Sequence, residues 1–340
     1  MTGSDGYIGS VMAKMLIDRG YDVLGCDTGF FRGRDFVEME YNLPTVGVDI
    51  RDIAESDVDG ADAFIHLAAL SNDPMGELDP KLTDEINHIA SVGLARLCKR
   101  IGCERFLYAS SCSMYGVSAA DQALTEEAPF NPVSAYALSK VEAERSISRL
   151  ADRHFSPVFL RNATAYGPSP RMRFDLVLNN LVGWGFATGK VRIMSDGTPW
   201  RPLVHVEDIS QAFLAALEAP RDMIHNQAFN VGADSQNFKV REIAGFVEKT
   251  IPDCKIEYAH NAAPDPRSYR VDFSKIATIL PAFKPRWTVE QGVRQLLHIF
   301  KTRGLTRQEF ESDEYTRLKK LKHLLMTGRL LEDLRWKRLG

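Results

Sequence analysis

The sequence predicts an α/β fold built on a doubly wound parallel sheet. Two patterns in residues 1–165 lead to this fold class: short apolar runs alternate with helical patterns, and a glycine-rich turn opens the first helix. Continuous apolar runs bounded by turn residues are typical of strands that are buried on both faces. The expected strands are 22–26, 45–48, 63–66, 105–109 and 157–160, and the expected helices are 7–19, 80–102, 134–153 and, further along, 174–188.

The pattern divides the chain into three parts. Residues 1–165 are expected to form the Rossmann-type sheet domain, and 166–303 a smaller C-terminal lobe with some segments returning to the main sheet. Residues 304–340 are expected to form a basic tail with helices over 313–326 and 330–337. We expect this tail to lie outside the active site, either against the smaller lobe or at a subunit contact.

Composition excludes several classes of protein. The 42 Lys and Arg residues against 45 Asp and Glu give a net charge of −3, which argues against a basic nucleic-acid-binding protein. No apolar run approaches the roughly 20 residues that span a bilayer, and the first residues do not resemble a signal peptide. The five cysteines form no CxxC pair and the eight histidines no HExxH motif. We therefore expect a cytoplasmic protein with reduced thiols, no metal site and no membrane partner.

Glycines at the start of the chain predict a dinucleotide site. Residues 3–9 have the spacing GxxGxxG, and a helical pattern begins directly after them. Glycine allows the tight turn and lets the backbone approach a pyrophosphate at the helix N-terminus. Asp27 ends the next apolar run, where an acid accepts hydrogen bonds from a ribose and repels a 2′-phosphate. NAD is therefore the expected cofactor, while Arg32 and Arg34 keep NADP open.

The start of the chain differs from this pattern in one respect. A glycine-rich turn of this kind follows a strand, and only Met1 and Thr2 precede it here. The first, central strand of the sheet is therefore expected to be missing, which would leave the strands at 22–26 and 63–66 without a neighbour. We expect the natural start to lie upstream, and a chain extended by an apolar strand to fold better and to bind NAD more tightly.

A tyrosine and a lysine supply the candidate chemistry. Tyr136 and Lys140 are four residues apart and lie one turn apart on one helix face. A free tyrosine has a pKa of about 10 and is a poor base at neutral pH. A neighbouring ammonium group is expected to lower that pKa. Hydroxyl side chains over 110–113 follow a buried strand, at the end of the sheet where ligands bind.

Together these motifs resemble the extended short-chain dehydrogenase/reductase family of NAD-dependent nucleotide-sugar epimerases and dehydratases. The resemblance rests on the glycines of 3–9, Asp27, the His-Leu-Ala-Ala of 66–69, the Ser-Ser-x-x-x-Tyr-Gly of 110–116 and the YxxxK of 136–140. It covers about residues 2–303, since Leu-Arg-x-x-x-x-Tyr-Gly-Pro and Asp-Gly-x-x-x-Arg elements also follow.

The resemblance implies a role for each matching residue. The implied catalytic residues are Ser111, Tyr136 and Lys140. The implied NAD-binding residues are Gly3, Asp5, Gly6, Tyr7, Ile8, Gly9, Asp27, Asp49, Ile50, Leu67, Ala68, Ala69 and Asn87, together with Tyr136 and Lys140. The implied substrate-binding residues are Ser113, Thr164, Asn179, Asn180, Arg201 and Arg267. The implied partners are a nucleotide sugar and a second copy of the chain in a homodimer.

The residues after Ser111 distinguish between possible reactions. Similar 4,6-dehydratases carry an Asp-Glu pair at this point, whereas this chain has Cys112 and Ser113, neither of which suits proton removal and water loss. Epimerisation at C4 through a transient 4-keto intermediate is therefore the leading prediction. An NAD(P)H-dependent reductase of a nucleotide 4-keto sugar is the alternative. A 4,6-dehydratase and a non-catalytic dinucleotide-binding protein are the less favoured hypotheses.

Overall fold

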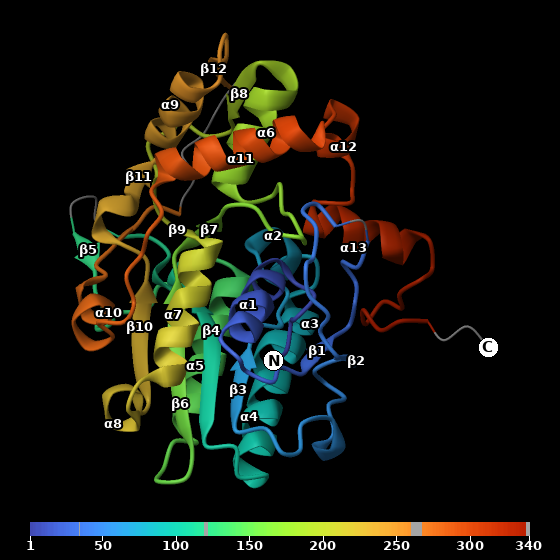
Figure 1. Ribbon diagram of the computed structural model, residues 1–340, viewed down its shortest axis with the longest axis vertical. Helices are drawn as coiled ribbons and strands as arrows, with labels where there is room; N and C mark the ends of the chain where they lie inside the picture. Colours follow the sequence, from blue (N-terminus) through green and yellow to red (C-terminus); the bar gives the residue numbers. More distant parts are fainter. Residues whose placement is uncertain (34, 119–121, 260–266, 338–340) are drawn as a thin grey trace.

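A parallel sheet lies at the centre of the computed structural model, which describes residues 1–33, 35–118, 122–259 and 267–337. Its strands run in the order β10-β6-β4-β3 and are all parallel (Figure 1). The predicted doubly wound α/β fold is thereby confirmed. The strands are β3 (Ala63–His66), β4 (Arg105–Ser111), β6 (Ser156–Asn162) and β10 (Gln227–Val231).

The first two residues of the chain connect this sheet to a second pair of strands. β1 (Gly25–Asp27) and β2 (Thr45–Gly47) pair in parallel. Thr2 forms bridges both to Cys26 of β1 and to His66 of β3, and its amide donates to the Ile65 carbonyl over 3.0 Å. Thr2 thus occupies the central position between β1 and β3. The prediction of a longer strand upstream stays a prediction.

Helices cover both faces of the sheet. Because side chains alternate along a strand, Leu107 of β4 faces α1 (Tyr7–Asp18) and α7 (Val206–Glu218), whereas Phe106 faces α4 (Ser91–Arg100) and α5 (Ala135–Ser148). Each face is a separate buried apolar cluster. The helix expected over 80–102 is divided into α3 (Pro80–Asp84), the π-helix η2 (Glu85–Ala90) and α4.

The smaller lobe stands above the carboxyl ends of the strands (Figure 1). Three helices enclose its apolar core, and a three-stranded sheet and a separate strand pair form its edges. The chain returns from the lobe to the main sheet in β10. The elements of the lobe are α6 (Val177–Thr188), α9 (Val240–Thr250), α11 (Val289–Arg303), β7 (Thr164–Tyr166), β9 (Trp200–His205), β11 (Asn237–Lys239), β8 (Lys190–Ile193) and β12 (Lys255–Tyr258).

Short elements complete the described chain. None of its helices is long and apolar enough to cross a membrane. These short elements are η1 (Glu55–Asp57), α2 (Asp73–Gly76), η3 (Cys112–Tyr115), β5 (Ala123–Leu124), α8 (Arg221–Ile224), η4 (Asp234–Gln236), β13 (Arg270–Val271), α10 (Ser274–Ile279), α12 (Arg307–Glu311) and α13 (Arg317–Met326).

The tail differs from its prediction. α13 forms within the helix expected over 313–326, but the helix expected over 330–337 is wrong, because Leu330 and Trp336 instead form an antiparallel bridge. Leu334 between them has a φ of 62°, which a helix does not accommodate. The leucines of α13 pack against the first domain beside α2 and α3. Leu305, Phe310 of α12 and Tyr315 pack into the core of the smaller lobe.

Candidate active site

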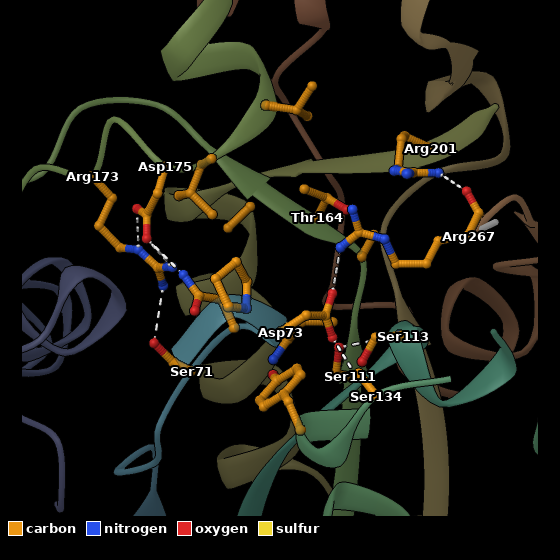
Figure 2. Close-up of a pocket in the computed structure, with 18 of the residues that line it drawn as sticks. Ser71, Asp73, Ser111, Ser113, Ser134, Thr164, Arg173, Asp175, Arg201 and Arg267 are labelled. Atoms are coloured by element: carbon orange, nitrogen blue, oxygen red, sulfur yellow. Dashed lines mark hydrogen bonds and ion pairs between the residues drawn. The ribbon is translucent and has the colours of Figure 1, made fainter. Parts of the chain in front are cut away.

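A cavity of about 680 Å³ lies between the sheet and the smaller lobe, within the range of 300–1,000 Å³ that is common for ligand sites. It opens at the carboxyl ends of β4 and β6 and is lined by polar side chains from both parts (Figure 2). Of the residues expected to bind substrate or to catalyse, those that line it are Ser111, Ser113, Tyr136, Lys140, Thr164, Asn180, Arg201 and Arg267.

A smaller cavity of about 140 Å³ adjoins the first. Both cavities are lined by Ile8, Leu67 and Ala69, so a ligand in one can reach the other. Of the residues expected to bind the cofactor, those that line the smaller cavity are Gly3, Gly6, Tyr7, Ile8, Gly9, Asp27, Asp49, Ile50, Leu67, Ala68 and Ala69.

Close packing explains the glycines of the first turn. Gly3 has a φ of 71°, and a Cβ atom added to it would lie 2.8 Å from the amide nitrogen of Ala68. A Cβ atom on Gly9 would overlap the carbonyl oxygen of Gly3. Backbone atoms therefore form the wall of the cavity, at the N-terminus of α1. This is the geometry that receives a pyrophosphate.

Asp27 closes the other end of the smaller cavity. Its carboxylate accepts hydrogen bonds from the amides of Asp5 over 3.0 Å and Gly29 over 2.8 Å. Burial raises the pKa of Asp27, and these two hydrogen bonds oppose that rise. A carboxylate held at this point can accept hydrogen bonds from ribose hydroxyls, so the side chains present fit NAD.

Tyr136 and Lys140 project from α5 into the larger cavity. Ser134 caps the helix and accepts a hydrogen bond from the Ala137 amide over 3.1 Å. The Lys140 Nζ atom donates to the Ala109 carbonyl over 2.8 Å and lies 5.9 Å from the centre of the Tyr136 ring. The helix cap and the hydrogen bond to β4 therefore set the position of both side chains.

Comparisons with known proteins agree with this geometry. The sequence profile of the NAD dependent epimerase/dehydratase family matches residues 1–232, which is more than half of the chain. The chain belongs to this family.

Individual relatives have low sequence identity, but the similarity extends over most of the chain. The chain is 26% identical to UDP-glucuronic acid decarboxylase 4 of Arabidopsis thaliana, over 92% of this chain and 70% of that protein. It is 25% identical to UDP-glucose 4-epimerase of Mycolicibacterium smegmatis, over 89% of this chain and 98% of the other. The structure of MoeE5 in complex with UDP-glucuronic acid and NAD superposes with a TM-score of 0.77, at 26% identity over 89% of this chain and 98% of that one.

These relationships confirm three predictions made from the sequence. The protein is an enzyme, its cofactor is NAD, and it modifies nucleotide sugars, as the family does. The family thus supplies both ligand classes, NAD and a nucleotide sugar, and the residues expected to bind them line the two adjoining cavities.

Burial shifts the pKa values of the family's tyrosine and lysine. It raises the pKa of Tyr136 to about 12, and a hydrogen bond with Ser111 partly opposes that rise. Burial also lowers the pKa of Lys140 to about 7. The expectation that Lys140 lowers the pKa of Tyr136 is therefore not met here, because a buried lysine carries its charge only weakly at neutral pH.

Neutral groups follow Ser111. The Cys112 thiol is buried and donates to the Arg161 carbonyl over 3.1 Å, and burial raises its pKa. The Ser113 hydroxyl is buried in the cavity wall without a hydrogen-bond partner among the described residues. Neither side chain is an acid or a base at neutral pH.

The carboxylates of the larger cavity are paired with arginines. Asp73 lies 2.5 Å from Arg267 and also accepts a hydrogen bond from Ser134 (Figure 2). Asp175 lies 2.9 Å from Arg173. These are the two acidic residues among the described residues that line this cavity. Each of the two carboxylates therefore lies against a guanidinium group.

Two asparagines do not lie where binding was expected. Asn179 does not line the cavity. Its side chain accepts a hydrogen bond from the Gly167 amide over 3.0 Å and donates one to the Arg173 carbonyl. Asn87 is also fully buried and bonds the backbone of Leu70 and the Ser139 hydroxyl. Both side chains therefore hold loops of the site in place through hydrogen bonds.

Charged residues near the adenosine end pair with each other. Arg32 lies 2.6 Å from Asp5, so Asp5 faces a cation instead of lining the cavity. Asp49 lines the cavity and lies 2.7 Å from Arg51. Arg34 is the second residue on which NADP was based as an alternative cofactor, and it lies outside the described residues.

Other lining residues were not predicted from the sequence. Arg173 lines both cavities and donates to Ser71 over 3.1 Å. Arg317 reaches the smaller cavity from the tail. The Arg-x-Arg pattern over 171–173, which follows the Tyr-Gly-Pro element after two residues, was a usable signal for Arg173. Nothing local in the sequence marks Arg317.

Proposed function

We propose that the enzyme is a nucleotide-sugar 4-epimerase that works through a transient 4-keto sugar. The observation that carries this proposal is the absence of an available acid–base pair beside Tyr136. Among the described residues, Cys112 and Ser113 are neutral, while Asp73 and Asp175 are paired with arginines. Epimerisation needs one group that takes and returns a proton, whereas dehydration also needs groups that remove a carbon-bound proton and expel water.

The proposed roles follow from position. Tyr136 takes the proton of the C4 hydroxyl, and Ser111 hydrogen-bonds the same oxygen. NAD, when bound, would supply reversible hydride transfer at C4. The keto sugar turns over in the cavity between these steps, and Tyr136 then returns its proton to the new hydroxyl. No net redox change results.

Arginines on the lobe side are the proposed contacts for the nucleotide diphosphate. Arg201 and Arg267 both line the larger cavity and lie beside each other (Figure 2). Planar guanidinium groups match pairs of phosphate oxygens. A UDP sugar is the first substrate to try, because the Mycolicibacterium smegmatis relative is named for UDP-glucose and MoeE5 was crystallised with UDP-glucuronic acid.

The test is a product assay by NMR. The enzyme with NAD is incubated separately with UDP-glucose, UDP-galactose and UDP-glucuronic acid, and Tyr136→Phe serves as the control. The expected result is a C4 epimer with no net change in NADH. A pentose product would indicate decarboxylation and a 6-deoxy methyl signal dehydration. Net consumption of NADH with a 4-keto sugar would indicate a reductase, and each of these three results would overturn the proposal.

A further inference from the structure

Arg317 brings a buried cation from the tail to the NAD cavity. It is the first residue of α13, its side chain is 3% exposed, and it lines the same small cavity as Gly3 and Gly6. One guanidinium nitrogen donates to the Arg171 carbonyl over 2.8 Å, and the group lies 4.2 Å from the centre of the Phe31 ring. The guanidinium is thus held in place at the cavity wall.

No carboxylate in the described part of the chain forms an ion pair with Arg317. Its cationic neighbours already have acids of their own: Arg173 pairs with Asp175, and Arg171 pairs with Asp35. Burial and the charge of Arg173 lower the pKa of Arg317 to about 9, so the group is still charged at neutral pH. A buried charge without a counterion is costly, and the cavity beside it is where an anion can be placed.

The NAD diphosphate is the anion that fits this position. The glycine turn and the N-terminus of α1 form one wall of the cavity, and such a wall receives pyrophosphate. We propose that Arg317 binds the diphosphate of NAD and that the C-terminal tail retains the cofactor in the enzyme. This proposal differs from the expectation that the tail lies outside the active site.

Further contacts hold the C-terminal tail against the part of the smaller cavity where the adenosine of NAD is expected. The Trp336 indole donates to the Thr28 carbonyl over 2.6 Å, and its ring centre lies 5.6 Å from that of Phe30. Thr28 and Phe30 both line the NAD cavity. NAD release therefore requires movement of the tail or of the loop that it holds. This inference uses NAD binding alone and is independent of which sugar reaction follows.

The test compares Arg317→Met with Lys322→Met, which removes the same charge from an exposed position of the same helix. NADH affinity is measured by fluorescence, and ADP and adenosine affinities by ligand-observed NMR, on cofactor-free enzyme. Arg317→Met should weaken the binding of NADH and ADP by about 10- to 100-fold, because the lost contact is a charged hydrogen bond to phosphate. The affinity for adenosine, which has no phosphate, should stay unchanged. Lys322→Met should match wild type. The melting temperature of cofactor-free Arg317→Met should not fall, because an uncompensated buried charge has been removed.

Unchanged NADH affinity, or an equal loss for adenosine, would overturn the role of Arg317. A second variant tests the tail without altering the cavity wall. Trp336→Ala removes the anchor on Thr28 and should speed NADH release at least several-fold in stopped flow, whether or not Arg317→Met folds. An unchanged release rate would overturn cofactor retention by the tail.

Discussion

Burial raises the pKa of the Tyr136 hydroxyl to about 12, so this residue must lose its own proton before it can take one from the sugar. Lys140 is four residues away, yet its own burial brings its pKa down to about 7. Tyrosine and lysine can be found in the sequence by their spacing alone. Their protonation depends on how many apolar groups surround them, and that number is set by packing from distant parts of the chain.

The first prediction concerns the tyrosine hydroxyl. Tyr136→Phe should lower turnover by about 10²–10⁴-fold, because proton transfer is lost while packing is kept. Tyr166→Phe is the matched control: its hydroxyl is buried without a partner among the described residues, so its loss should leave turnover near wild type. Substantial turnover by Tyr136→Phe would remove this residue from the mechanism.

The second prediction concerns the stability effect of Lys140. Its pKa falls from 10.5 to about 7 on folding, so between these pH values the unfolded chain binds a proton that the folded chain does not. The contribution of Lys140 to the free energy of unfolding is therefore least favourable at and below pH 7, and it rises as the pH increases. The melting temperature of Lys140→Met minus that of wild type should be largest near pH 7 and should shrink by pH 9. A difference that is independent of pH would contradict the lowered pKa.

At the scale of elements, strand positions followed from apolar runs, and β3 matches its expected range of 63–66. The predicted helix boundaries were less accurate where side chains form hydrogen bonds with distant parts of the chain. The expected helix over 80–102 is interrupted by a π-helix where Asn87 bonds Leu70 and Ser139, partners that lie far apart in the sequence.

The third prediction tests the turn before α1. Gly9→Ala should abolish measurable NAD binding and lower the melting temperature, because the new Cβ atom would overlap the Gly3 carbonyl. Gly93→Ala, where a Cβ atom meets nothing within 4 Å, should raise stability by about 0.5–1 kcal/mol. Thermal melts with and without NAD distinguish the two variants. Normal NAD binding by Gly9→Ala would show that the turn can rearrange.

At the scale of the whole molecule, the tail is part of the first domain's core. Leu321 and Leu324 are almost fully buried in one cluster with Phe30, Ile50 and Leu70. Three of these partners lie in segments that border the NAD cavity. The tail and the cofactor site therefore share a folding unit. The homodimer and the cytoplasmic location stay predictions, and light scattering tests the first.

The fourth prediction tests this packing. Leu324→Ala should lower the free energy of unfolding by about 2–5 kcal/mol, as is usual for a buried leucine. Met326→Ala alters the same helix at a side chain that is 82% exposed, and should change stability by less than about 0.5 kcal/mol. Urea denaturation measures both. Similar small effects for the two variants would mean that the tail is only loosely attached.

The sequence by itself determined the NAD turn and the pairing of Tyr136 with Lys140, because each depends on spacing within a few neighbouring residues. It also determined the parallel sheet, through the alternation of apolar runs with helical patterns. Only the tertiary structure decided that Asn179 braces a loop, that Asp73 is paired with Arg267, and that Arg317 reaches the NAD cavity. These outcomes depend on which distant segments meet in space. A charged or amide side chain has the same local signature whether it meets a ligand, a partner side chain or a backbone carbonyl, and long-range packing makes that choice.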